Sequence, residues 1–179
     1  STSAFISIHN MAAWMIDRFG SQALKDKYLP SMIPMDRLGS YCLTEAGSGS
    51  DAAALKTRAV RDGDHYVVTG SKQFISGGGE NELYVVMVRT GEDGPRGISC
   101  LVIEKDMEGV SFGAQEKKLG WNSQPTAALI LDKVKVLKEN PPPDSMVLIP
   151  GVIDVTTNYL EHPEVVAEFV NRAPFRKLD

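Results

Sequence analysis

Two short stretches of this sequence combine the groups that could hold a flat ring with polar edges. Residues 41–53 read YCLTEAGSGSDAA, a short apolar run that enters a loop of small residues. The backbone N–H groups and hydroxyls of such a loop can meet phosphate or heterocycle oxygens. Residues 70–78 read GSKQFISGG, in which Phe74 stands beside Ile75 and Ser76. An isoalloxazine ring requires an apolar face next to hydrogen-bond donors, so we predict that the two stretches form one flavin-binding cradle.

Each stretch also has a plainer interpretation when it is taken alone. The run of small residues at 47–50 is typical of a surface turn, and Phe74 is typical of a core aromatic within a strand. Thr44 could be a strand residue with a satisfied hydroxyl, and Ser50 could cap a turn. The three glycines at 77–79 favour the cradle at Phe74, because glycine permits close backbone approach at a cost in strand stability.

The order of these stretches, together with three more, resembles the acyl-CoA dehydrogenase family. The others are FGSQALKDKYLP, YVVMVRTGEDGPRGISCLVIEK and EKKLGWNSQPTAALILDKVKV. The resemblance covers residues 1–138, has the look of the branched short-chain members, and does not continue beyond that point. One departure is Ala46, which stands where the family usually has proline, so the entry to the loop should be less rigid.

The resemblance implies that this chain contacts FAD and an acyl-CoA. It implies that Phe74 packs on the flavin and that Ser50 also touches the acyl-CoA. Family members are homo-oligomers that pass electrons to electron-transfer flavoprotein, in the mitochondrial matrix or in a bacterial cytoplasm. The implied FAD contacts are Tyr41, Cys42, Leu43, Thr44, Glu45, Ala46, Gly47, Ser48, Gly49, Ser50, Phe74, Ile75 and Ser76.

The family's reaction removes an α proton and a β hydride from a thioester, so it needs a base and a hydride acceptor. Donors at the pyrimidine edge of the flavin stabilise the negative charge that develops on reduction, and Thr44 with its neighbouring N–H groups is our candidate. We predict that Glu45 and Asp51 are turn or helix-start carboxylates and not bases. The family's catalytic glutamate lies in a C-terminal helical domain, and no position here matches that motif. We therefore assign no catalytic residue and expect the chain to bind both ligands without turning over alone.

Composition agrees with a globular protein and argues against several other classes. Hydrophobic residues make up 42% of the 179 residues and charged residues 23%, with a formal net charge of −4. Because the basic residues are scattered among acidic ones, nucleic acid and anionic membrane are poor partners. The two cysteines, Cys42 and Cys100, lie too far apart in sequence for a close-spaced metal site or a disulfide framework, and they favour a reducing compartment. No apolar run approaches the roughly 18 residues that span a bilayer.

Hydrophobic spacing predicts two helices followed by a β domain. Apolar residues recur at helical spacing from Phe5 to Phe19, and a second helix is predicted from a cap at Ser21 to Tyr28, stopped by Pro30. His9 is predicted to be a partly exposed polar member of the first helix. Short runs bounded by turn residues then predict about seven or eight strands of an antiparallel barrel or sandwich. Those runs are 40–43, 56–61, 65–69, 82–89, 97–104, 110–115 and 127–136, with tight turns at 62–63, 93–94 and 132–133.

We therefore predict an α+β chain in three parts. Residues 1–38 end an N-terminal helical domain that is truncated here, and residues 39–138 form the middle β domain of the family. Residues 139–179 begin with a proline-rich linker and continue as a short βα tail outside the family pattern. We expect the chain to be a piece of a longer protein. A different class of function also stays open, a non-catalytic interaction module that assembles with full-length subunits through an exposed sheet edge.

Overall fold

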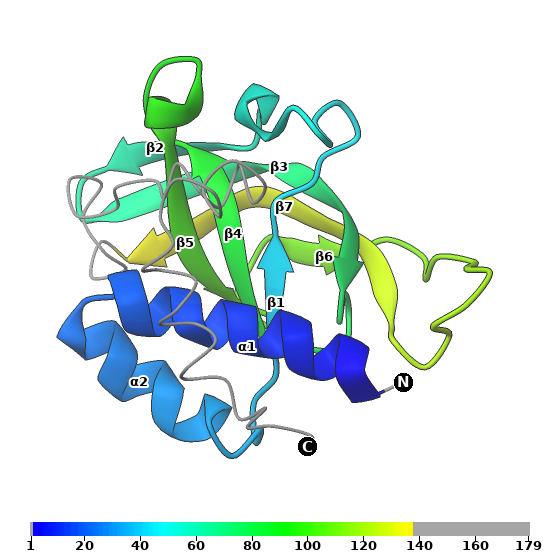
Figure 1. The fold of residues 1–179 in the computed structure, drawn as a ribbon. Helices are drawn as coiled ribbons and strands as arrows, with labels where there is room; N and C mark the ends of the chain where they lie inside the picture. Colours follow the sequence, from blue (N-terminus) through cyan, green and yellow to red (C-terminus); the bar gives the residue numbers. More distant parts are fainter. Residues whose placement is uncertain (1, 138–179) are drawn as a thin grey trace, which may run out of the picture. The chain divides into compact units, whose positions relative to one another are not determined.

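The computed structural model describes residues 2–137, with side chains from residue 5 onward. These residues belong to one compact unit, Ser1–Val147. They form two helices and then seven strands (Figure 1), so the predicted fold class is confirmed for this part of the chain. The predicted linker and βα tail lie outside the described residues. Within residues 2–137, no helix is long and apolar enough to cross a bilayer.

The two helices form where the periodicity predicts them. Helix α1 runs Thr2–Phe19 and ends just before Gly20, while helix α2 runs Gln22–Met32 with Ser21 as its N-cap, accepting from the Leu24 N–H at 3.3 Å. The prediction that Pro30 stops the second helix is wrong. Pro30 lies in the last turn, where one missing N–H removes a single hydrogen bond, and the chain stays helical to Met32.

His9 is buried, with 3% of its surface exposed, which corrects the prediction of a partly exposed side chain. Its Nε2 lies 2.9 Å from the Met32 carbonyl oxygen, and its Nδ1 accepts from the Gly39 N–H at 3.0 Å. A Cβ at Gly39 would lie 2.9 Å from the Cβ of Ala12, which cannot shift without the helix, so the close approach of α1 to the first strand requires glycine there. His9 therefore joins α1, the end of α2 and the start of the sheet.

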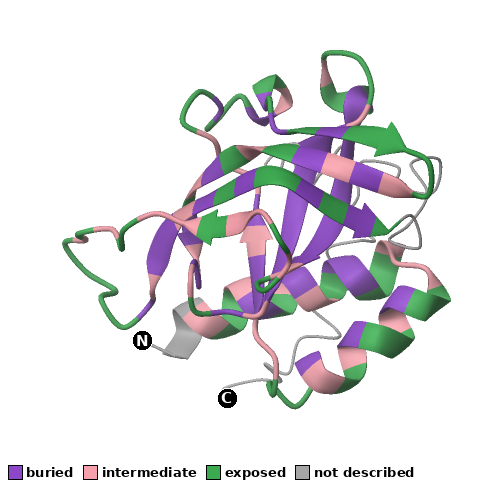
Figure 2. Ribbon diagram, turned by 180° about the vertical axis from the view of Figure 1, so that it is seen from behind, coloured by how far each residue is buried: buried purple, intermediate pink, exposed green. Residues whose placement is uncertain are grey.

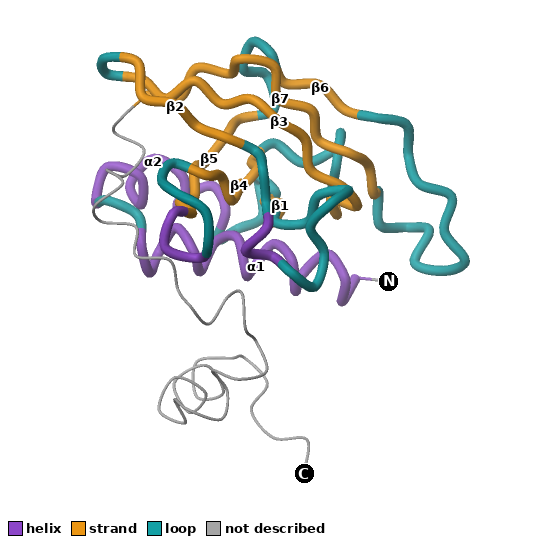
Figure 3. Tube along the Cα trace, turned by 90° about the horizontal axis from the view of Figure 1, so that it is seen from above, coloured by secondary structure: helices purple, strands orange, loops and turns teal. Residues whose placement is uncertain are grey.

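The seven strands form one curled, mixed sheet. Strand order along it is β1-β4-β2-β3-β7-β6, and β5 pairs with the other edge of β4. Figure 3 shows the helices on the side of β4 and β5, with β2, β3, β7 and β6 across from them. The strands are β1 Gly39–Cys42, β2 Arg58–Asp62, β3 His65–Ser76, β4 Leu83–Arg89, β5 Ile98–Glu104, β6 Val110–Phe112 and β7 Thr126–Leu137.

Two strands are longer than their local patterns suggest. β3 continues through the whole GSKQFIS stretch to Ser76. β7 continues through Lys133, where we predicted a tight turn; that residue has a φ of 55° and lies where the pairing with β3 shifts register. The left-handed residue is thus absorbed as an irregularity within a strand, and the turn prediction at 132–133 is wrong.

The pairing of β1 with β4 is parallel, although an antiparallel domain was predicted. Cys42 at the end of β1 pairs with Val86, and Arg58 at the start of β2 pairs with Arg89, in the same direction. β1 and β2 thus share one edge of β4, because β5 occupies the other. Residues 43–57 leave the sheet at one point of this edge and return to it three residues further along β4.

The core lies between the two layers of the curled sheet. It contains side chains of β4 and β5, such as Val86 and Leu101, packed with side chains of β3 and β7, such as Val68 and Leu129. All seven residues of β4 are buried, as Figure 2 shows by the continuous purple of that strand. A strand covered on both faces needs a continuous apolar run and not an alternating one. β4 is therefore a rigid support for the strands β1 and β2 that pair with its edge.

A charged cluster ties helix α2 to the sheet. The Glu104 carboxylate, at the end of β5, accepts from Lys27 Nζ at 2.8 Å, from the Tyr28 hydroxyl at 3.0 Å and from Arg37 Nη2 at 2.8 Å. Burial alone would raise the pKa of Glu104, but these hydrogen bonds outweigh it and lower the pKa from 4.5 to about 2. The carboxylate is held in its charged form at neutral pH.

Candidate functional site

The structure brings the two predicted cradle stretches side by side. The Gln73 N–H donates to the Thr44 carbonyl at 2.8 Å, and the Ser40 hydroxyl donates to the Ser76 carbonyl at 2.7 Å. The segment from Ser40 to Thr44 therefore lies alongside β3. A single planar ligand could contact both.

Residues 43–57 form an Ω-loop, a compact excursion whose two ends lie close together. Its far end is held by Arg89, whose guanidinium is buried and donates to the carbonyls of Leu55 at 3.1 Å and Ala53 at 2.6 Å. The same guanidinium donates to the Gly94 carbonyl at 3.1 Å, which also fixes the β4–β5 loop. Loops on a rigid scaffold commonly carry binding residues.

The near end of the Ω-loop is held by a buried ion pair. Lys72 Nζ, on β3, donates to a Glu45 carboxylate oxygen at 2.7 Å and to the Leu43 carbonyl at 3.1 Å. The Lys72 side chain is 0% exposed and that of Glu45 is 10% exposed. The Glu45 carboxylate also accepts the N–H groups of Lys56 at 2.7 Å and Thr57 at 2.9 Å. It therefore closes the loop by joining its beginning to its end.

This network sets the charge state of both partners. Burial would raise the pKa of Glu45, but the hydrogen bonds from Lys72, Thr57 and Lys56 outweigh it and lower the pKa. Burial lowers the pKa of Lys72, with Glu45 opposing the shift. Glu45 is thus a turn carboxylate fully engaged by the fold, as its sequence position suggested, and it is a poor base.

The loop then makes a tight turn at Ala46 and Gly47. Glu45 and Ser48 exchange two backbone hydrogen bonds, of 2.9 and 3.1 Å. Neither Ala46 nor Gly47 has a positive φ, so the turn suits proline at its second position. The Ala46 N–H donates no hydrogen bond within residues 2–137.

We predict that Ala46→Pro stabilises the folded chain by about 0.4–1 kcal/mol, because proline removes conformational freedom from the unfolded chain at a compatible position. Urea unfolding followed by circular dichroism measures the difference. Gly47→Pro is the matched control, since the third position of this turn disfavours proline. An A46P chain no more stable than the parent would contradict the assigned turn.

Several polar groups of the cradle stay available for a ligand. The N–H groups of Gly47, Gly49 and Ser50 donate no hydrogen bond within the described residues, and all three residues are exposed. The hydroxyls of Thr44, Ser50 and Ser76 likewise have no partner in that part of the chain. Together they offer donors along both predicted stretches.

Phe74 is not a core residue. Its side chain is 63% exposed, and its backbone has a φ of 57°, in the left-handed region that non-glycine residues rarely adopt. It lies where the pairing between β3 and β7 shifts register, between Lys72 and Ile75. A strained backbone that presents an aromatic ring to solvent is typical of a binding position. The core interpretation of Phe74 is therefore wrong.

Other predicted site residues are used by the fold. Cys42 and Ile75 belong to the hydrophobic core, so only their backbones can face a ligand. The Ser48 hydroxyl donates to the Asp51 carbonyl at 2.8 Å. The Tyr41 hydroxyl is buried without a hydrogen-bond partner in the described part of the chain, and burial raises its pKa. Leu43 is half-buried.

The glycines after Phe74 serve the turn into β4. Gly77 has a φ of 78°, and a Cβ there would lie 2.1 Å from the Asn81 side chain. The Gly77 carbonyl accepts from the Asn81 N–H at 2.8 Å and from the Tyr84 hydroxyl at 3.2 Å. Gly77 therefore has a structural reason that does not involve a ligand.

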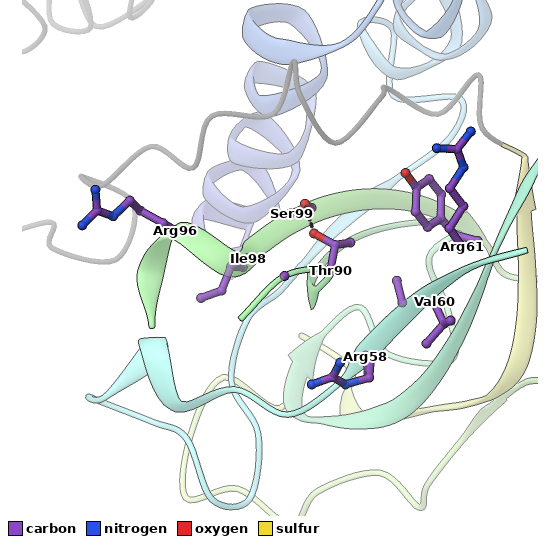
Figure 4. A pocket seen from close by; sticks show the side chains of 10 residues that line it. Arg58, Val60, Arg61, Thr90, Arg96, Ile98 and Ser99 are labelled. Carbon is purple, nitrogen blue, oxygen red and sulfur yellow. Dashed lines mark hydrogen bonds between the residues drawn. The ribbon is translucent and has the colours of Figure 1, made fainter. Parts of the chain in front are cut away.

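A separate pocket of about 450 Å³ opens between β2 and the β4–β5 loop (Figure 4). None of the thirteen predicted cofactor residues lines it. Its arginines, Arg58, Arg61 and Arg96, lie on different sides of the pocket and do not point toward one another. Arg61 also donates to the Gly63 carbonyl at 3.5 Å. The pocket is thus distinct from the cradle and lacks a converging set of polar groups.

Comparison with known proteins identifies the fold that carries this cradle. Residues 40–134 match the family model of the acyl-CoA dehydrogenase middle domain, and residues 1–36 match that of the acyl-CoA dehydrogenase N-terminal domain. The chain belongs to the acyl-CoA dehydrogenase family. The cradle therefore lies in the middle domain of that family.

Two mitochondrial isobutyryl-CoA dehydrogenases are among the relatives of this chain. That of Dictyostelium discoideum is 61% identical over 76% of this chain, and that of Bos taurus is 60% identical over 76%. The chain covers 33% of each, so it spans about a third of the length of the curated relatives it matches. A glutaryl-CoA dehydrogenase from Mycobacterium smegmatis, solved in complex with FADH2, is 29% identical with a TM-score of 0.71, over 76% of this chain and 35% of that one.

Sequence reasoning missed the two buried cations that hold the Ω-loop. Lys72 could have been found, because it continues the inward-facing alternation of Tyr66, Val68 and Gly70 along β3. A lysine on a core-facing position requires a buried partner. Arg89 gave a weaker signal, since it follows an unbroken apolar run and its partners are backbone carbonyls.

Proposed function

We propose that this chain is the FAD- and acyl-CoA-binding part of a flavin-dependent dehydrogenase that acts on a short, branched acyl-CoA. The observation that carries the proposal is the cradle itself: Phe74 presents an exposed aromatic ring next to Gln73, whose N–H binds the Thr44 carbonyl at the start of the Ω-loop. The 61% identity to an isobutyryl-CoA dehydrogenase supports the branched short-chain substrate.

The residues present fit FAD. FAD, when bound, supplies the hydride acceptor for the β carbon of the thioester. We propose that Phe74 packs on the ring, that Thr44 and Ser76 donate to its polar edge, and that the N–H groups of Gly47 and Gly49 meet other oxygens of the cofactor. Ser50, exposed at the outer part of the Ω-loop, is proposed to touch the acyl-CoA as well.

No residue of the cradle is proposed as the base for the α proton. Glu45 is already engaged by Lys72 and two backbone N–H groups. Asp51 is an exposed carboxylate before the short 3₁₀ helix Ala52–Ala54. Since the family's base belongs to its C-terminal domain, we propose that these 179 residues bind both ligands but do not turn over alone.

The wider setting follows the family. We propose a mitochondrial matrix protein, or a cytoplasmic one if the source is bacterial, that works as a homo-oligomer and passes electrons to electron-transfer flavoprotein. Both isobutyryl-CoA dehydrogenase relatives are mitochondrial, which supports the first location.

Titration of the purified chain with FAD, followed by quenching of flavin fluorescence, tests the proposal. We expect saturable binding, weakened by Thr44→Val and Ser76→Ala. Ser111→Ala is the matched control, because Ser111 is exposed on β6, outside the cradle, and should leave binding unchanged. Addition of isobutyryl-CoA without oxygen should leave the flavin oxidised, and Ser50→Ala should weaken binding of the acyl-CoA.

Two results would contradict the proposed function. A chain that is folded by circular dichroism but does not bind FAD would favour the interaction module, with assembly through a sheet edge as its function. Bleaching of the flavin by isobutyryl-CoA alone would show that these residues do contain a base.

A further inference from the structure

The Ω-loop is closed at its neck by one side chain of the loop and one of the sheet. Glu45 reaches from the start of the loop to the N–H groups of Lys56 and Thr57 at its end. Lys72 reaches from β3 to that same carboxylate and to the Leu43 carbonyl. The ion pair thus joins three segments, the two ends of the loop and the strand that carries Phe74.

Thr44 lies between the two groups that Lys72 binds. Leu43, whose carbonyl Lys72 binds, precedes Thr44, and Glu45, whose carboxylate Lys72 binds, follows it. The Thr44 carbonyl itself accepts from the Gln73 N–H. Gln73 is in turn the neighbour of both Lys72 and Phe74. A shift of the Lys72 ammonium would therefore move Thr44 relative to the Phe74 ring.

A buried ion pair is a poor way to gain stability alone, because desolvation offsets most of the attraction. Replacement of such a pair by apolar residues is often neutral for stability. Its value here is geometric, since the bonded ammonium and carboxylate together fix three backbone groups, the Leu43 carbonyl and the N–H groups of Lys56 and Thr57, at set distances.

We propose that Lys72, acting through Glu45 and the Leu43 carbonyl, is the positioning residue that holds the Ω-loop against β3 in the geometry that binds flavin. This inference rests on the proposed function. It also changes the role of Glu45, which the family resemblance counts among the FAD contacts, to a residue that shapes the site without touching the cofactor.

The test compares Lys72→Met with the double variant Lys72→Met/Glu45→Gln. The single variant leaves a buried carboxylate without its cation and should lose stability, whereas the double variant removes both charges and should recover most of it. FAD affinity should behave differently. We expect the dissociation constant to rise about tenfold in both variants, by analogy with the loss of affinity when partners that orient metal ligands are removed. Lys135→Met, at an exposed position of β7, is the control and should change neither quantity.

A second measurement does not depend on FAD. Amide hydrogen exchange of the ligand-free chain should show protection at Lys56, Thr57 and Gln73, and Lys72→Met should remove it while the amides of β4 and β5 stay protected. If the parent chain binds no FAD, the proposed function fails but this exchange experiment still tests the neck. Unchanged exchange, or recovery of FAD affinity together with stability in the double variant, would overturn the positioning role.

Discussion

Replacing Phe74 with glycine is expected to weaken FAD binding about tenfold, because stacking of a heterocycle on an aromatic ring contributes about 1–3 kcal/mol. The free energy of unfolding should change much less than the free energy of FAD binding. The ring is 63% exposed, so it contributes little to the core, and a φ of 57° is a conformation that glycine adopts without strain. Flavin fluorescence titration and urea unfolding give the two quantities.

Two companion variants separate the ring from the backbone. Phe74→Ala removes the ring but keeps the left-handed strain, so it should be less stable than the glycine variant by about 1 kcal/mol. Phe74→Trp keeps a flat aromatic surface and should retain FAD affinity. If Phe74→Ala binds FAD as tightly as the parent chain does, the ring is not part of the flavin site.

Glu104→Gln is expected to cost about 1–3 kcal/mol of folding free energy, since it weakens hydrogen bonds to a charged acceptor. Lys27 contributes least, because its side chain is 56% exposed and water screens it. The buried Tyr28 and the 29%-exposed Arg37 contribute most. Because Glu104 of β5 binds Lys27 and Tyr28 of α2, the loss of folding free energy should come from weaker packing of this helix on the sheet.

The same carboxylate predicts how stability depends on pH. Its pKa is lower in the folded chain, about 2, than the ordinary 4.5, so its contribution is complete above about pH 4.5 and is lost as the pH falls from there through 2. Thermal midpoints between pH 7 and 2 should converge for the parent chain and Glu104→Gln at the acid end. Glu108→Gln, at an exposed residue of the following turn, should track the parent throughout. A constant gap at all pH values would show that Glu104 acts by packing and not by charge.

Local sequence patterns were enough to predict the helices and the positions of most strands. Strand partners, pairing directions and the burial of His9 depend on contacts between residues far apart in the sequence. The spacing of apolar residues in α1 and the Ser21 cap are local signals, so they were readable. The pairing of β1 with β4 joins Gly39 to Leu83, and no local pattern specifies such a partner or its direction. His9 was misjudged for the same reason, because its partners, Met32 and Gly39, lie far along the chain.

The candidate site shows the same division. Phe74 and the small residues of the Ω-loop stand out by type, so motif and resemblance both predict them as site residues. What the sequence could not show is which of these groups remain available. Ser48 and Ser50 look alike in the sequence, yet the Ser48 hydroxyl is bound to the Asp51 carbonyl while that of Ser50 has no partner within residues 2–137. That distinction depends on the path of the loop in space.

The shared edge of β4 also constrains the order in which this domain can fold. β1 finds its sheet partner only after β4 has formed, and the intervening segment includes the whole β2–β3 hairpin. Pairings of high sequence separation form slowly, so the hairpin and the β4–β5 pair should gain exchange protection first in refolding, and β1 with its attached helices last. The loop between β1 and β2 acquires its shape only at that final step, so the proposed FAD binding would report completed folding.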